Sequence, residues 1–281
     1  MISSPVRNNR SWILIWPFAK LGLFLWNSRN KFIALGKFNR RREADDNLLN
    51  ELCPERKVLD GPFKGLRYPS LSSIGSTLLP KLIGSYEKEI HHIIESLFSI
   101  KYSEIMNIGC GEGYYAVGLS LKFPTARVFA FDTNVDARRL CHEMALINGV
   151  ADKIIVGSIC TPLFLKDFNF TYRGLIVCDC EGCEGRLFDK NNLPSLTHCD
   201  FLIETHDFID IEISDRLKEL FSQTHFIESV YSVDDIWKAK TYWYSQTSNF
   251  DLKTKMEIFR EGRPTSMEWI FLKSKKWMPN E

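Results

Sequence analysis

Residues 104–113 read Glu-Ile-Met-Asn-Ile-Gly-Cys-Gly-Glu-Gly, an apolar stretch that ends in three glycines. The apolar stretch predicts a buried strand, and the glycines predict a tight turn into a helix over 112–122. Because glycine has no Cβ, the backbone at such a turn can approach a bound ligand closely. The sequence therefore predicts a ligand-binding strand–turn–helix unit at this position.

Strand and helix patterns alternate on the C-terminal side of this unit, where residues 135–148 have the apolar spacing of a helix. The further predicted strands are 127–132, 153–158, 174–179, 200–206, 225–231 and 267–272. Near-continuous apolar strands that alternate with helices indicate an α/β fold, a mostly parallel sheet with helices on both faces. The last two strands have no clear helix pattern between them and are expected to pair antiparallel at one edge.

An aspartate ends the second predicted strand, 19 residues after Gly113. At that position the carboxylate of Asp132 can accept hydrogen bonds from both hydroxyls of a ribose. The glycines have GxGxG spacing, whereas dinucleotide-binding turns have GxGxxG, so the spacing counts against a nicotinamide cofactor. The unit predicts a site for a ribose-containing ligand.

Asn107-Ile-Gly-Cys-Gly-Glu-Gly113 and Phe129-Ala-Phe-Asp132 resemble the first two motifs of class I S-adenosylmethionine-dependent methyltransferases. The resemblance implies a Rossmann-like sheet of seven strands in the order 3-2-1-4-5-7-6, with strand 7 antiparallel, and S-adenosylmethionine as the cofactor. The cofactor-binding residues that it implies are Asn107, Gly109, Gly111, Gly113, Asp132, Ser158 and Asp179. Two positions depart from the family pattern: Asn107 stands where an acid is usual, and Ser158 stands where an aspartate often lies near the adenine amine.

A second signature, Asp179-Cys-Glu-Gly-Cys-Glu184, follows the fourth predicted strand. It resembles the D-x-E-G-x-E signature of FkbM-type methyltransferases, and the resemblance covers roughly residues 100–232. This family implies O-methyl transfer, often to sugars or secondary metabolites. We therefore expect an S-adenosylmethionine-dependent O-methyltransferase that acts on a hydroxyl group of a sugar or a glycan precursor.

Methyl transfer to an alcohol requires a base within hydrogen-bond reach of the hydroxyl. In open α/β sheets, such groups lie beyond the carboxyl ends of the strands. The candidate catalytic residues there are His206, Glu181 and Asp179, and the histidine is flanked by Glu204 and Asp207. The competing interpretation is that His206 caps a turn or forms a hydrogen bond in the core.

The carboxylates at these strand ends have other interpretations as well. Glu184 stands where a helix starts, and a carboxylate is favourable there without any role in catalysis. Asp179, Glu181 and Asp207 offer oxygen ligands that suit Mg²⁺, so a divalent cation is an alternative, although no metal site is predicted.

Eight cysteines are present, several of them in apolar runs where a free thiol behaves as a small hydrophobic group. We therefore expect a reducing compartment and no disulfide scaffold. Cys178, Cys180 and Cys183 are closely spaced but lack the CxxC…CxxC spacing of zinc sites. The first two are expected on one face of the fourth strand, so buried thiols without a metal are predicted.

Charge is distributed unevenly along the 281 residues. The first 42 residues hold nine Lys and Arg and no acid, so within a net charge of +1 the remaining 239 residues carry −8. An acidic body without an Asn/Asp-Pro-Pro-Tyr motif after the fourth strand argues against nucleic acid as a partner. The expected acceptor is a small molecule or glycan that bears a hydroxyl group.

Residues 12–26 form an aromatic, apolar run inside the basic segment. A helix of this length would span about 22 Å, which is short of the roughly 30 Å hydrocarbon core of a bilayer. Lying on an anionic membrane surface, docking to a partner and packing on the protein's own core all fit this composition. The expected location is the cytoplasm, with peripheral binding to the inner face of the membrane.

The chain is expected to comprise an N-terminal extension (1–50), a lead-in region (51–100) and a methyltransferase domain (101–281) with an insertion (233–266). In the lead-in region we expect a hairpin over 61–69 and a helix over 85–100 that Ser85 caps. This region is expected to cover the cofactor pocket, with Tyr86 and Glu87 within reach of the ligand.

The insertion is rich in aromatic residues, including Trp237 and Trp243, which fits either a lid over a sugar acceptor or an amphipathic helix packed on the sheet. Two further functions stay open. One is a catalytically inactive methyltransferase-like scaffold in a membrane-associated assembly, and the other is a nicotinamide-dependent oxidoreductase.

Overall fold

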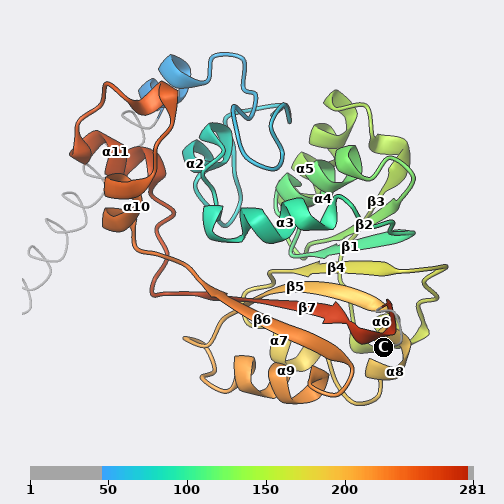
Figure 1. Ribbon diagram of the computed structural model, residues 1–281. Coiled ribbons are helices and arrows are strands. Elements are labelled where there is room, and N and C mark those ends of the chain that lie inside the picture. The colour runs from blue at the N-terminus through green and yellow to red at the C-terminus, as the bar shows by residue number, and fades with distance from the viewer. Residues whose placement is uncertain (1–45, 278–281) are drawn as a thin grey trace, which may run out of the picture. The chain divides into compact units, whose positions relative to one another are not determined.

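Seven strands form one sheet in the computed structural model of the protein, which describes residues 46–277 (Figure 1). The strand order is β3-β2-β1-β4-β5-β7-β6, and β7 is antiparallel to both of its neighbours. The strands are β1 (Glu104–Ile108), β2 (Arg127–Phe131), β3 (Ile154–Gly157), β4 (Gly174–Cys178), β5 (Cys199–Thr205), β6 (His225–Tyr231) and β7 (Glu268–Ser274). The predicted α/β fold, its strand order and its reversed strand are confirmed.

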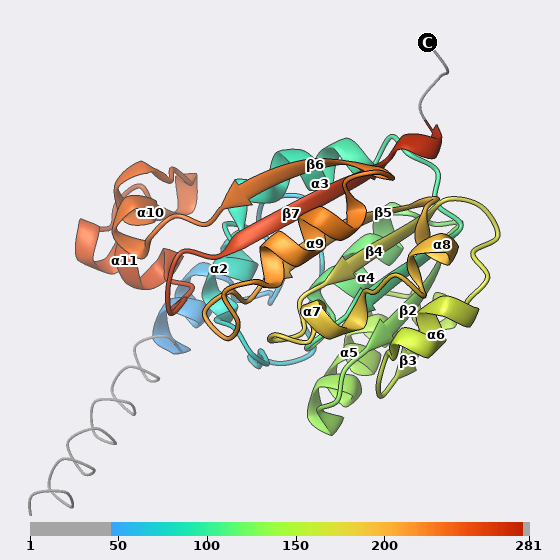
Figure 2. The same ribbon diagram turned by 90° about the horizontal axis from the view of Figure 1, so that it is seen from below.

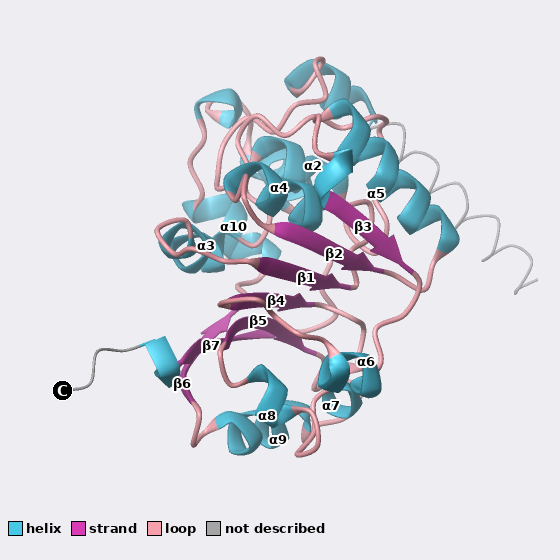
Figure 3. Ribbon diagram, turned by 90° about the vertical axis from the view of Figure 1, so that its right-hand side faces the viewer, coloured by secondary structure: helices cyan, strands magenta, loops and turns pink. Residues whose placement is uncertain are grey.

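Helices cover both faces of the sheet (Figure 3). One face carries α2 (Leu78–Ile83), α3 (His91–Leu97), α4 (Tyr114–Lys122) and α5 (Val135–Ile147). The other carries α6 (Pro162–Asp167), α7 (Glu184–Leu187), α8 (Leu193–Leu196) and α9 (Ile213–Phe221). Side chains alternate along each strand, so Ile105 joins the first core and Met106 the second. Burial on both faces explains why the strands have near-continuous apolar sequences.

The carboxyl ends of the central strands lie side by side. Ile108 at the end of β1 pairs with Phe131 of β2 on one side and with Cys178 of β4 on the other. Cys178 pairs in turn with Ile203, two residues before the end of β5. The residues that follow these strands therefore meet at one edge of the sheet, where ligands of open α/β folds bind.

The lead-in region differs from the prediction in two places. The hairpin expected over 61–69 is reduced to a single antiparallel bridge between Lys57 and Arg67. The helix expected over 85–100 starts later, with a 3-10 turn at Lys88–Ile90 followed by α3. Ser85 is not its cap, because its hydroxyl donates a hydrogen bond to the carbonyl of Pro80 in the preceding helix α2.

The insertion forms two short helices, α10 (Asp235–Thr241) and α11 (Leu252–Phe259), which lie together beyond one end of β6 and β7 (Figure 2). Asp234 caps α10 by accepting hydrogen bonds from the backbone N–H groups of Ile236 and Trp237. Ile258 and Phe259 of α11 are buried in the first core, so this part of the chain is packed on the domain.

The sheet belongs to a compact unit that begins at residue 48. The aromatic segment 12–26 lies outside the described residues, so its binding to a membrane, a partner or the protein's own core stays a prediction. Among residues 46–277, no helix is both long enough and apolar enough to cross a bilayer.

Candidate active site

A cavity of about 550 Å³ opens at the carboxyl edge of the sheet. The residues predicted from the sequence that line it are Gly109, Gly111, Asp132, Ser158, Asp179, Glu181 and His206. Asn107 and Gly113, predicted to bind the cofactor, do not line it, and neither does Glu87, which was expected within reach of the ligand. One cavity thus combines the glycine-rich turn with the candidate catalytic groups.

Gly109 is the position of the turn at which no other residue fits. Its φ is +81°, and a Cβ there would lie 1.5 Å from the backbone oxygen of Asp179. The backbone N–H groups of Gly109 and Cys110 both donate to the carbonyl oxygen of Phe131, at 2.8 and 2.9 Å. The turn is therefore fixed against the ends of both β2 and β4.

Asp132 is held ready for a ligand at the end of β2. Its Oδ2 accepts a hydrogen bond of 2.8 Å from the backbone N–H of Gly111, and its Oδ1 accepts one of 2.8 Å from Asn134. Each carboxylate oxygen has a further lone pair. The side chain is half-buried and lines the cavity, so these lone pairs can accept hydrogen bonds from ribose hydroxyls.

Asn107 and Gly113 have structural roles here. The Asn107 side chain is buried, and its Nδ2 donates to the carbonyl oxygen of Val177 at 3.4 Å, while its Oδ1 has no partner among the described residues. Gly113 has φ +102° at the start of α4, where a Cβ would lie 3.1 Å from Sγ of Cys141. In this structure neither residue contacts the cavity that a cofactor would occupy.

Glu112, between the glycines, is a residue that the sequence analysis missed. Its buried carboxylate accepts hydrogen bonds from the Lys81 ammonium at 2.6 Å, the backbone N–H of Ile74 at 3.0 Å and the Ser73 hydroxyl at 3.1 Å. Burial alone would raise the pKa of Glu112, but Lys81 more than offsets this and lowers it. Glu112 thereby fastens the lead-in region, of which Ile74, Gly75, Ser76, Lys81 and Tyr86 line the cavity.

His206, directly after β5, lies between three carboxylates. Its Nδ1 lies 3.0 Å from Oε1 of the fully buried Glu184. Its Nε2 lies 3.5 Å from Oδ1 of Asp179 and 3.5 Å from Oε2 of Glu181. The two ring nitrogens therefore have different surroundings: Nδ1 lies beside Glu184 inside the protein, and Nε2 faces the groups that line the cavity.

The charge on His206 follows from these contacts. Burial alone would lower the pKa of the imidazole, but Glu184, Asp179 and Glu181 outweigh this effect and raise it above 6.5. A histidine with a raised pKa is a stronger base once it is neutral. This arrangement can take a proton from a hydroxyl group bound beside Nε2.

Glu184 is both the first residue of α7 and the partner of His206. Its Oε1 accepts hydrogen bonds from the backbone N–H groups of Cys180 at 2.9 Å and Gly182 at 3.4 Å. The expectation that it serves a helix start is therefore only part of its role. The carboxylate is fixed by the same turn that carries Glu181.

Asp207 does not join this group. Its two oxygens accept hydrogen bonds from the backbone N–H and the hydroxyl of Ser214, at 2.9 and 2.6 Å. The three residues considered for Mg²⁺, Asp179, Glu181 and Asp207, are thus not brought together. Asp179 instead lies with Glu184 and His206, and one possible metal-ligating atom from each of these residues lies within 4.8 Å of the others. Glu87, Asp179 and Glu204 form a second group with the same spacing.

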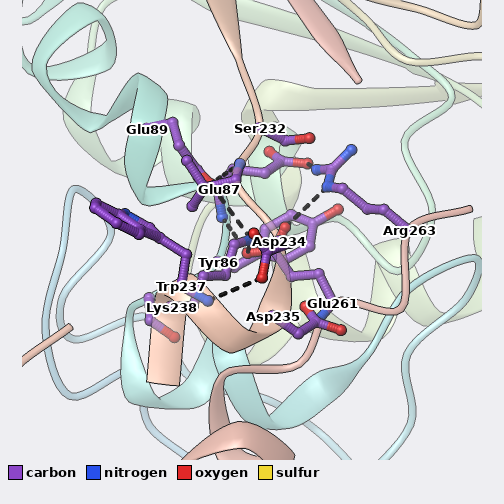
Figure 4. Close-up of polar contacts among 12 residues, drawn as sticks. Tyr86, Glu87, Glu89, Ser232, Asp234, Asp235, Trp237, Lys238, Glu261 and Arg263 are labelled. Atoms are coloured by element: carbon purple, nitrogen blue, oxygen red, sulfur yellow. Dashed lines mark hydrogen bonds and ion pairs between the residues drawn. The ribbon is translucent and has the colours of Figure 1, made fainter. Parts of the chain in front are cut away.

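A buried cluster around Arg263 reaches the cavity, which Glu204, Glu261 and Arg263 line. Figure 4 shows Glu87, Glu261 and Arg263 of this cluster. The guanidinium donates from Nε to Glu261 at 2.9 Å, from one terminal nitrogen to Glu87 at 2.7 Å, and from the other to Glu204. All three carboxylates are buried. We call these four residues the Arg263 cluster, and they come from three distant parts of the chain.

The carboxylates outnumber the cations in this cluster. Burial raises the pKa of Glu87 to about 7, although Arg263 acts in the opposite direction. Burial also raises the pKa of Glu204 well above its usual range, and Asp179 adds to the effect. Since the one guanidinium is shared by three acids, Arg263 is already saturated with protein partners.

The insertion reaches the cavity through this cluster and not through its tryptophans. Trp237 and Trp243 are 55% and 71% exposed and do not line the cavity, which Glu261, Gly262, Arg263 and Pro264 do. Lys238 of α10 is fully buried with its Nζ 2.5 Å from Oε1 of Glu261. This ion pair connects α10 to the segment that lines the cavity.

The cysteine prediction needs a correction. Cys180 and Cys183 form a disulfide, whereas the sequence predicted buried thiols at these positions and no disulfide scaffold. Cys180 also does not belong to β4, which ends at Cys178. A tight turn brings the two Cα atoms to 5.5 Å, a separation that allows a disulfide. The CxxC spacing itself was the signal for this pair.

The observed strand order is the one that the resemblance to class I methyltransferases implied. No protein-family model matches the chain. It is 30% identical over 93 residues to the release factor glutamine methyltransferase of Deinococcus radiodurans, a match that covers 33% of each protein. The chain thus spans about a third of the length of this curated relative.

Solved structures of methyltransferases are similar at low sequence identity. Precorrin-6y C5,15-methyltransferase from Geobacter metallireducens is 13% identical, with a TM-score of 0.45 over 65% of this chain and 86% of that one. An S-adenosylmethionine-dependent O-methyltransferase from Thermotoga maritima is 14% identical, with a TM-score of 0.42 over 68% and 65%. None of these comparisons tests the FkbM-type resemblance, which stays a prediction.

Proposed function

We propose that the protein is an S-adenosylmethionine-dependent O-methyltransferase that acts on a hydroxyl group of a sugar or a glycan precursor. The observation that carries this proposal is one cavity that holds both halves of such a reaction. The glycine-rich turn and Asp132 line this cavity, and so do His206, Asp179 and Glu181. The match to a curated methyltransferase supports the reaction class.

The cofactor half is assigned from its hydrogen-bonding capacity. Asp132 would accept hydrogen bonds from the ribose hydroxyls, and the Gly109–Gly111 backbone would lie against the amino acid portion of the cofactor. Ser158 lies exposed at the rim of the cavity, where an adenine ring would end. When bound, S-adenosylmethionine supplies an activated methyl group on its sulfonium.

The acceptor half supplies the base. Nε2 of His206 would take the proton of an acceptor hydroxyl as the oxygen of that hydroxyl receives the methyl group. Glu184 holds the ring and stabilises its positive charge. Asp179 and Glu181 lie 3.5 Å from Nε2 and can accept hydrogen bonds from neighbouring hydroxyls of a polyol.

Transfer of a labelled methyl group tests this proposal. The wild type is incubated with methyl-labelled S-adenosylmethionine and a panel of mono- and disaccharides, with and without Mg²⁺, and the methyl ether is identified by mass spectrometry. His206→Ala is expected to lower kcat by about a hundredfold or more. His92→Ala, which removes a 63% exposed histidine, is the matched control and should leave the rate unchanged.

The outcome separates acceptor classes. Label on oxygen of a saccharide supports the proposal, and full activity of His206→Ala would overturn the assignment of the base. The curated relative has a glutamine acceptor according to its name, so a glutamine-containing peptide belongs in the panel. Label on an amide nitrogen would replace O-methylation with N-methylation.

A further inference from the structure

The disulfide Cys180–Cys183 closes a four-residue turn at the mouth of the cavity. Both cysteines line the cavity, and Cys183 is exposed while Cys180 is half-buried. The backbone N–H of Cys183 donates to the carbonyl oxygen of Cys180 at 3.4 Å. The disulfide can therefore be reached by a reductant from the solvent.

The other six cysteines differ from this pair in being buried free thiols. They are Cys53, Cys110, Cys141, Cys160, Cys178 and Cys199. Burial raises the pKa of Cys53 and of Cys160 to about 12 and also raises that of Cys199, so these thiols are not thiolates at neutral pH. Among the described residues, Cys180 and Cys183 form the one disulfide that an external thiol could reduce.

The turn that the disulfide closes has an unfavourable backbone. Its central residues, Glu181 and Gly182, have φ of +55° and +93°. Glycine adopts this conformation freely, but it is unfavourable for an L-residue such as glutamate. A covalent link between the flanking residues opposes this preference and keeps the turn closed.

The closed turn also positions the groups around His206. Oε2 of Glu181 lies 3.5 Å from Nε2 of His206, and the N–H groups of Cys180 and Gly182 hold Glu184. In the cofactor half, Gly109 packs on the backbone of Asp179 and Cys180, but Asp132 is held separately by Gly111 and Asn134. Opening the turn would therefore disturb the groups around His206 and leave the hydrogen bonds of Asp132 in place.

We propose that Cys180 and Cys183 are a reversible redox site that reacts with a dithiol, and that its state sets the geometry around His206. A thiolate of the dithiol attacks one sulfur of the pair, and its second thiol resolves the mixed disulfide. The dithiol leaves as a disulfide, and Cys180 and Cys183 each gain a thiol proton. The disulfide form is the active form, and this link to activity rests on the proposed function.

Alkylation of the folded full-length protein tests the first half of the proposal. Before treatment with dithiothreitol, iodoacetamide is expected to label neither cysteine of the pair, and after treatment both, as located by peptide mass spectrometry. Cys53→Ala should behave as the wild type does. Absence of labelling after reduction would overturn the proposal. So would a bond between Cys178 and Cys180, whose sulfurs lie 3.6 Å apart.

Proton NMR of the His206 ring tests the second half without using activity. The His206 resonance, assigned by its loss in His206→Ala, is expected to shift on reduction and to return on reoxidation. In the double variant Cys180→Ser, Cys183→Ser, the His206 resonance should have the chemical shift of the reduced wild type, and dithiothreitol should not change it. An identical resonance in both redox states would overturn the proposal.

Binding and turnover separate this inference from the proposed function. Reduction should lower the rate of methyl transfer several-fold and leave the affinity for S-adenosylhomocysteine unchanged. If the thiols and His206 respond while no acceptor is methylated, the proposed function fails and the redox site stands. If methyl transfer occurs at the same rate in both states, the redox inference fails alone.

Discussion

The two halves of the cavity are built in different ways. The cofactor half comes from β1, β2 and the turn between residues 108 and 114, and backbone groups make its main contacts, such as the N–H of Gly111 to Asp132. The acceptor half is made of charged side chains that are distant in the sequence, such as Glu87, Glu204 and Arg263. A short motif therefore describes the first half, and only the folded chain assembles the second.

This difference predicts how each half fails. A side chain at Gly109 would clash with the backbone of Asp179, because its Cβ would lie 1.5 Å from the Asp179 carbonyl oxygen. The effect of a substitution at the glycine-rich turn is therefore local and steric. Removal of one charge from the acceptor half leaves its partners buried without compensation, so the effect spreads to all of them.

The largest effect is expected from Arg263→Ala. The substitution leaves Glu87, Glu204 and Glu261 buried without their shared guanidinium, which typically lowers the free energy of unfolding by about 3–5 kcal/mol. Denaturant unfolding at pH 7 measures this change. Arg216→Ala, which removes an arginine from exposed ion pairs, is the control and should have little effect. Equal effects of the two substitutions would contradict a charge-built acceptor half.

A smaller effect is expected from the titration of Glu87, whose pKa burial raises to about 7. Between pH 4.5 and 7 the folded state keeps a proton that the unfolded chain releases, so the free energy of unfolding falls as the pH rises through this window. In Glu87→Gln, the free energy of unfolding should decrease by about 1–3 kcal/mol less over this pH window than in the wild type.

Unfolding by denaturant across pH 4.5–7 measures the Glu87 effect. Glu95→Gln, at an exposed position on α3, is the matched control and should keep the full pH dependence. If the free energy of unfolding of Glu87→Gln had the same pH dependence as that of the wild type, the proton would be bound by a group other than Glu87. The assignment of Glu87 as the titrating carboxylate of the acceptor half would then be wrong.

The smallest effect concerns the pH dependence of methyl transfer. His206 acts as a base only when neutral, and its pKa is raised above 6.5, so kcat should rise with pH and have its midpoint above 6.5. Glu184→Gln removes a neighbouring negative charge and should move this midpoint to lower pH. Glu219→Gln, at an exposed position on α9, should not move it. A midpoint that stays in place in Glu184→Gln would separate Glu184 from the base.

Much of the fold was predictable from local patterns. All seven strands were expected close to their observed places, and the central strands β1, β4 and β5 gave the clearest pattern because each is a short apolar run that is buried throughout. Asp132 and the glycines were predictable for a related reason: a tight turn at the end of a strand requires particular residue types, such as glycine where φ is positive and a Cβ would clash. The helix expected from Ser85 began late because Ser85 bonds back to Pro80 in α2.

The acceptor half was predictable only in part. His206, Asp179 and Glu181 follow strand ends, and their positions after β4 and β5 bring them to the cavity. Asp207, the next residue after His206, accepts hydrogen bonds from Ser214 instead. Nothing local pairs Arg263 with Glu87, which is 176 residues away. Such a pairing depends on the packing of the insertion, for which the sequence has no periodic signal.

Calorimetric titration with S-adenosylhomocysteine tests the division of the cavity most directly. The wild type should bind at micromolar concentration, Asp132→Ala should lose that binding, and His206→Ala should keep it, since the two residues belong to different halves. No binding by folded wild type would contradict the cofactor assignment. An equal loss in His206→Ala would contradict the separation of the two halves.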